Sequence, residues 1–143
     1  MPTIEKITTD VFRLPLRSPL KWGKHSVMDE ARHVLVRVYL SDGAIGTAEA
    51  LPRPTIYGET IWSVPSVIAH ELSPRIVGEP ADPSQTYPLL QQVKNNQTAK
   101  GAVDVALHHA IAQSNGVSLA EHLGGTRERV RVSYILGLSL IHI

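Results

Sequence analysis

The spacing of hydrophobic residues changes near the middle of the chain, and this change limits the fold more than any other feature. In residues 4–16 and 33–50, apolar residues alternate with other residues, as in strands that bury one face. After residue 60 they recur every three or four residues, as on helices that bury one stripe. Strands followed by helices predict an α+β domain with an antiparallel sheet.

The strongest strand signal lies in residues 33–50. Val34, Val36, Val38 and Leu40 alternate with other side chains, Asp42-Gly43 provides a turn, and residues 44–50 return as a partner strand. Residues 4–16 predict an earlier strand. Residues 18–32 keep no sustained period and residues 51–58 are rich in proline and glycine, so both segments are predicted to be loops.

Helices are predicted over the second half of the chain. Pro65 must lie in the first turn of its helix or kink it, and Asp82-Pro83 is typical of a helix start. Five small residues on the longest helix favour close approach of another backbone: Ala99, Gly101, Ala102, Ala106 and Ala110. The predicted helices cover residues 61–72 (closed by Pro74), 83–93, 97–115 and 118–123, and a strand is predicted over 130–136.

Composition excludes several classes of protein. The chain has no cysteine, which rules out disulfides, thiolate zinc sites and thiol nucleophiles. A formal charge of +1 argues against nucleic-acid binding. The start of the chain does not resemble a signal peptide, and no apolar run is long enough to span a membrane. A cytoplasmic protein is therefore expected, with no nucleic-acid or membrane partner.

The sequence offers no clear catalytic set. His108 and His109 point about 100° apart on a helix and cannot easily share a metal ion. Asp104 and His108 share a helix face, where a surface ion pair or a domain contact is favoured over a metal site. Glu49 and Glu59 would be candidates for acid–base work, although ordinary structural roles are favoured for both.

Two segments are better candidates for binding. The 18–32 segment contains Trp22, Lys24 and His25, and the 51–57 segment contains Arg53, Ile56 and Tyr57. Each segment mixes aromatic or apolar side chains with basic ones, and loops of this kind often carry binding residues. The alternative is that Trp22 and Tyr57 only pack over a sheet edge.

Several motifs, in this order, resemble the muconate cycloisomerase/mandelate racemase group of the enolase superfamily. The resemblance extends over residues 4–137, and it depends on the order of the motifs because none of them is specific alone. They are Val34-Leu35-Val36-Arg37-Val38 with Asp42-Gly43 to Ala50, then Tyr57-Gly58-Glu59-Thr60, Ala99-Lys100-Gly101-Ala102-Val103-Asp104, Gly116-Val117-Ser118-Leu119, Leu123-Gly124-Gly125 and Val132-Ser133-Tyr134. Many members have Trp-Asp where this chain has His108-His109.

The resemblance implies an N-terminal capping domain, made of a three-stranded antiparallel sheet and a helical bundle. In the family, a C-terminal (β/α) barrel supplies acid–base lysines and carboxylates that hold Mg²⁺ or Mn²⁺. A base removes the proton α to a substrate carboxylate, and the metal stabilises the enediolate. No catalytic or metal residue is expected in this chain, which alone should be inactive.

The resemblance also implies a role for the two segments. They match lid loops that close the barrel mouth and touch a small carboxylate substrate, so Trp22, Lys24, His25, Arg53, Ile56 and Tyr57 are expected substrate contacts. A muconate cycloisomerase or dipeptide epimerase is favoured, with a racemase or sugar-acid dehydratase as alternatives. A homo-oligomeric full-length protein is expected. A stand-alone binding module and a subunit that meets a separately encoded barrel remain open.

Three divisions of the chain are expected. Residues 1–129 form the capping domain, and residues 130–137 are the lead-in strand of the missing barrel. Residues 138–143 read Leu138-Ser-Leu-Ile-His-Ile143, which CTGTCTCTTATACACATC encodes, and that DNA resembles a transposase-based sequencing adapter. These six residues are therefore expected to be an artefact.

Overall fold

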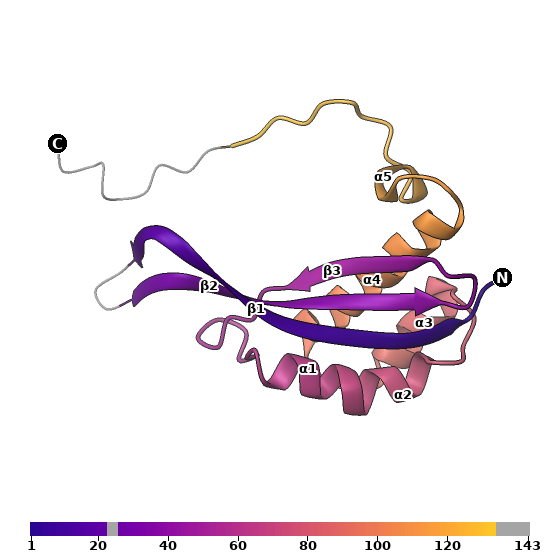
Figure 1. The fold of residues 1–143 in the computed structure, drawn as a ribbon, viewed down its shortest axis with the longest axis horizontal. Helices are drawn as coiled ribbons and strands as arrows, with labels where there is room; N and C mark the ends of the chain where they lie inside the picture. Colours follow the sequence, from indigo (N-terminus) through magenta and orange to yellow (C-terminus); the bar gives the residue numbers. More distant parts are fainter. Residues whose placement is uncertain (23–25, 134–143) are drawn as a thin grey trace.

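A three-stranded antiparallel sheet organises the first part of the chain in the computed structural model, which describes residues 1–22 and 26–133. The strands are β1 (Ile4–Trp22), β2 (Ser26–Leu40) and β3 (Ile45–Ala50), in the order β1-β2-β3. Val34 pairs with Ala50 and Val38 with Gly46, which confirms the predicted hairpin of residues 33–50. Figure 1 shows the sheet lying across the helices.

The predicted loop over residues 18–32 is wrong, because β1 and β2 continue through most of it. They form a two-stranded ribbon that projects beyond the helices (Figure 1), with a register shift between Pro15 and Leu20. The ribbon buries neither face, so selection for alternating side chains is absent and the period-2 signal disappears. Pro15 and Pro19 are tolerated because β1 is an edge strand, where a missing N–H costs no pairing.

The first helical run is longer than the sequence indicates. It consists of α1 (Ser63–Val67), the π-helical turn η1 (Ile68–Leu72) and α2 (Ser73–Ile76), so Pro74 does not end it. The Ser73 N–H donates to the Ile68 carbonyl, five residues back. This wider turn directly precedes Pro74, whose ring would clash with a regular helix and which has no N–H of its own.

The other predicted helices are confirmed, with small differences at their ends. They are α3 (Pro83–Leu90), α4 (Gln97–Ser114) and α5 (Leu119–His122). Asp82 caps α3 by accepting the Ser84 N–H, and α3 ends at Leu90 instead of Val93. Ser118 and Glu121 form the predicted capping box of α5. No helix within the described residues is both long and apolar enough to cross a membrane.

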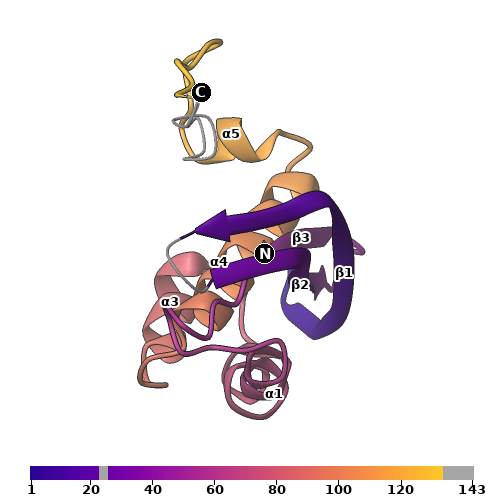
Figure 2. The same ribbon diagram turned by 90° about the vertical axis from the view of Figure 1, so that its left-hand side faces the viewer.

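The core lies between one face of the sheet and the helices, and Figure 2 shows this packing along the sheet. Alternate β2 residues point inward, the 63–76 run contributes one apolar row, and α4 contributes another. Full burial of each such valine, leucine or isoleucine stabilises the fold by about 1.5–3 kcal/mol. The largest fully buried side chains, which include one each from β1 and α3, are Ile4, Val34, Val36, Val38, Leu40, Val64, Ile68, Leu72, Ile76, Leu90, Val103 and Leu107.

The small residues of α4 allow the close approach that the sequence predicts. Gly46 of β3 lies so near α4 that an added Cβ would be 1.9 Å from the Ala106 carbonyl oxygen. Beside this contact, His109 Nδ1 accepts the backbone N–H of Thr47 at 3.0 Å. His109 therefore satisfies a backbone donor on an edge strand.

The segment after α5 has no regular structure as far as residue 133. Residues 126–133 are exposed. The predicted strand over 130–136 is thus wrong for residues 130–133, and residues 134–136 lie outside the described residues. A strand needs a neighbour for its N–H and C=O groups, and no described segment pairs with this one.

Candidate functional site

One cavity lies between the projecting ribbon and the loop of residues 51–56. Its volume is about 370 Å³, and its walls are side chains from the β2 arm and from the loop. Arg53 connects the two walls, because its Nη1 donates to Met28 Sδ at 3.2 Å. The structure therefore brings together parts of both segments that the sequence singled out. The lining residues are Val27, Met28, Glu30, Arg32 and residues 51–56.

Some charged side chains around this cavity have a partner of opposite charge, whereas Arg53 has none among the described residues. Glu30 binds Arg32 and lies 3.8 Å from Arg13, so its carboxylate has two basic neighbours. Arg53 has no carboxylate within salt-bridge distance in residues 1–22 and 26–133, and its recorded acceptor is a weakly accepting thioether. A guanidinium in this state favours an anionic ligand, above all a carboxylate that it can bind through two nitrogens.

The 51–58 loop is closed by its own backbone. The N–H groups of Ile56 and Tyr57 both donate to the Arg53 carbonyl, at 3.0 and 2.8 Å. Ile56 and Tyr57 are 66% and 61% exposed, respectively, so the turn presents two large side chains to solvent. Single exposed apolar residues are common, but Ile56 lines the cavity that contains the uncompensated Arg53, and Tyr57 follows it in the same turn, which fits a binding loop.

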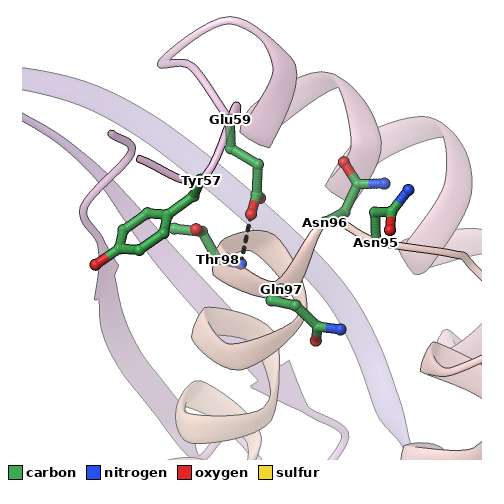
Figure 3. Close-up of a pocket in the computed structure, with 6 residues that line it drawn as sticks. All are labelled: Tyr57, Glu59, Asn95, Asn96, Gln97 and Thr98. Carbon is green, nitrogen blue, oxygen red and sulfur yellow. Dashed lines mark hydrogen bonds between the residues drawn. The ribbon is translucent and has the colours of Figure 1, made fainter. Parts of the chain in front are cut away.

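Tyr57 borders a second pocket, at the start of α4. This pocket has a volume of about 490 Å³ and is lined by Tyr57, Glu59, Asn95, Asn96, Gln97 and Thr98. Figure 3 shows Tyr57 and the two asparagines on opposite sides of Glu59. Tyr57 is thus near Arg53 in the chain but lines a different pocket.

Glu59 accounts for the geometry of that second pocket. It is 7% exposed, and its two oxygens accept the N–H groups of Thr98 at 2.8 Å and Ala99 at 3.0 Å. Asn95 and Asn96 both have φ of +55°, so the turn before α4 takes an uncommon left-handed course. Glu59 and Thr98 are 39 residues apart, and no local pattern in the sequence indicates that they meet. The sequence therefore did not predict that residues 95–98 line a pocket with Tyr57.

The weaker catalytic candidates have structural roles. Glu49 Oε2 lies 2.9 Å from His33 Nδ1, while Glu59 is bound to α4, so the two glutamates do not form an acid–base pair. His108 Nδ1 lies 2.9 Å from His122 Nε2, and no Asp104–His108 ion pair forms in the described part of the chain. Within residues 1–22 and 26–133, no three His, Asp or Glu side chains gather as a metal site would require.

Three of the predicted contacts cannot be placed in either pocket. Trp22 is the last residue of β1, and Lys24 and His25 lie outside the described residues. The ribbon instead contributes Met28, Glu30 and Arg32, which the sequence did not single out. A predicted loop gives no reason to group these three residues. In a strand, alternate side chains point to the same side, so Met28, Glu30 and Arg32 share one face.

Comparison with known proteins identifies the fold. Residues 4–124 match the model of the mandelate racemase/muconate lactonizing enzyme family, N-terminal domain. The chain belongs to this family. The membership confirms the expected capping domain, with its three-stranded antiparallel sheet and following helices.

Similar members of the family perform different reactions. L-Ala-D/L-Glu epimerase of Bacillus subtilis is 31% identical over 138 residues, which are 95% of this chain and 37% of that protein. o-Succinylbenzoate synthase of the same organism is 32% identical, over 97% of this chain and 38% of that protein. The crystal structure of a muconate lactonizing enzyme from Mycobacterium smegmatis, complexed with muconolactone, superposes with a TM-score of 0.88 at 37% identity.

The matches also show how much of such a protein this chain represents. It spans 37% of the muconate lactonizing enzyme chain and a similar share of both curated relatives, while 95% of its own length is covered by that structure. Family members of this size therefore contain a large region that has no counterpart in these 143 residues.

Proposed function

We propose that this chain is the substrate-recognising N-terminal domain of an enzyme that removes the proton α to a substrate carboxylate. The observation that carries the proposal is the cavity between the ribbon and the 51–56 loop, where Arg53 faces an opening without a carboxylate partner among the described residues. Family membership supports the reaction class, because the similar proteins include cycloisomerases and epimerases.

In this proposal the chain itself binds and orients substrate. Arg53 pairs with an anionic group of the substrate, Ile56 covers an apolar part and Tyr57 closes the neighbouring side. Trp22, Lys24 and His25 complete the lid. Ordering substrate in this way lowers the entropic part of the barrier before chemistry starts.

The acid–base residues belong to a (β/α) barrel outside this chain. Mg²⁺ or Mn²⁺, the expected cofactor, would stabilise negative charge on the substrate when bound there. The described residues do not fit such a metal, since no group of three ligands is present among them, and we derive no step through it. The capping domain is assigned to residues 1–129, and residues 130–137 to the entry of the barrel.

Muconate cycloisomerase and dipeptide epimerase activities are the first two candidates for the full-length protein. Both are represented among the similar proteins at 30% identity or more. We place the protein in the cytoplasm, in keeping with its lack of cysteine, and expect it to be a homo-oligomer.

The test is an assay of the full-length protein encoded by the source gene. DNA prepared independently is first read past codon 137, where a continuing frame with a Lys-x-Lys strand and spaced Asp and Glu codons is expected. Proton NMR in D₂O then follows L-Ala-L-Glu and muconate. Divalent-metal-dependent loss of the α-proton signal, or lactone formation, supports the proposal; a stop codon directly after codon 143 contradicts it.

Replacement of Arg53 tests whether this side chain binds the substrate. In the full-length protein, Arg53→Met should raise KM about tenfold with little change in kcat, because one charge-assisted hydrogen bond to the substrate is lost. Arg75→Met is the matched control, since Arg75 pairs with Glu71 on the helices far along the chain from this loop. An unchanged KM in the Arg53 variant would exclude the residue from substrate binding.

A further inference from the structure

The start of α4 is capped by a residue far away in the sequence. Asn96 precedes the helix and makes no side-chain capping hydrogen bond. Glu59 supplies the missing acceptor, with both oxygens on the Thr98 and Ala99 N–H groups. Its carboxylate also lies at the N-terminus of an 18-residue helix, where the helix dipole attracts negative charge.

The same residue ends the loop that carries Tyr57. Gly58, the one residue between them, has φ of +78°, and an added Cβ there would meet nothing within 4 Å. Glycine is needed for this bend because of its positive φ, not because of crowding. The chain therefore turns sharply between the buried carboxylate and the exposed ring.

The loop before Gly58 is held together by backbone hydrogen bonds. Two N–H groups, of Ile56 and Tyr57, converge on the Arg53 carbonyl and close the turn. The turn itself makes few other connections: among side-chain hydrogen bonds, the Arg53 contact to Met28 joins it to the ribbon. On its other side the turn leads to Glu59, which accepts a hydrogen bond from the Thr98 N–H (Figure 3).

We infer that Glu59 is a positioning residue, which fixes the Arg53–Tyr57 turn to the first turn of α4. It holds Tyr57 at the edge of the pocket whose opposite wall is the Asn95–Thr98 segment. If the proposed function is right, Glu59 presents the lid to substrate without touching it. This role differs from that of a simple helix cap, because it requires the turn to loosen when the carboxylate is removed.

Site-resolved amide exchange, followed by NMR on the 143-residue chain, separates the two roles. Glu59→Ala should speed exchange at Thr98 and Ala99, and also at Ile56 and Tyr57, by about tenfold each, as expected for one lost hydrogen bond of ordinary strength. Glu59→Gln retains one carbonyl oxygen and should give a smaller change at the same amides. Buried amides such as Val36 and Leu107 should keep their rates.

Glu71→Gln is the matched control, because Glu71 pairs with Arg75 within the 63–76 helical run and not with this loop. Faster exchange confined to Thr98 and Ala99 would overturn the inference and leave Glu59 as a cap alone. Equal acceleration at Val36 and Leu107 would also overturn it, since general destabilisation would explain the loop. Neither result requires substrate, so the inference can fail while the proposed enzyme activity stands.

Discussion

At the scale of single residues, Gly46 shows the tightest constraint. Its Cα faces the backbone of α4, where a methyl group would lie 1.9 Å from the Ala106 carbonyl oxygen and 2.2 Å from the Ala110 nitrogen. Neither neighbour is a flexible side chain that could rotate away. Because β3 and α4 both carry core residues, strand and helix cannot separate here without opening the core.

Gly46→Ala is therefore expected to destabilise the fold by about 3 kcal/mol, at the upper end of overpacking costs. Gly101→Ala is the control. Gly101 lies on α4, the helix that Gly46 contacts, but an added Cβ at Gly101 would meet nothing within 4 Å. It should stabilise by about 0.5–1 kcal/mol through helix propensity. Urea unfolding of both variants measures the difference, and equal midpoints would contradict the close approach.

At the scale of elements, the N-termini of α3 and α5 are each capped with the help of an ionised carboxylate, from Asp82 and Glu121, respectively. The Ser84 hydroxyl, the Gln85 side chain and the Ser84 N–H hold the pKa of Asp82 below its ordinary value. The Ser118 hydroxyl and N–H do the same for the pKa of Glu121. A carboxyl group whose pKa is lower in the folded state stabilises folding above its unfolded pKa, and this contribution is lost as pH falls through the folded value.

Asp82→Asn tests this dependence, because asparagine retains a capping oxygen and loses the charge. The variant should be less stable than the parent at pH 7, and the difference should shrink steadily as pH falls below about 4. Thermal melts followed by circular dichroism measure it, with Asp29→Asn on the exposed ribbon as control. A difference that is independent of pH would mean that the Asp82 charge does not contribute.

At the scale of the whole molecule, the packed part of the described residues ends before residue 126. The buried core ends at Ala112, and residues 126–133 are exposed with no regular structure. A chain ending at residue 129 should therefore melt within about 2 °C of the 143-residue chain. A clearly lower melting temperature would show that residues beyond 129 stabilise the capping domain.

Local patterns determined most of the elements. The alternation in β2, the Asp42-Gly43 turn, the Asp82 cap and the stripe on α4 each depend on residues within one or two turns of each other, so a single sequence specifies them. Two predictions were wrong for different reasons. The ribbon is exposed on both faces, and Pro74 is accommodated by a π turn that only packing of the 63–76 run selects.

The candidate site was predictable only as two separate segments. The sequence alone showed that residues 51–57 combine basic and apolar side chains and that the fold is α+β, and its resemblance to the family implied a capping domain. Tertiary structure decided that Arg53 meets Met28 of the ribbon, that Glu59 caps α4, and that His109 satisfies Thr47. Each of these contacts joins residues that are 25 to 62 positions apart in the sequence. No local pattern predicts such pairs, because the packing of the elements against one another determines which residues meet.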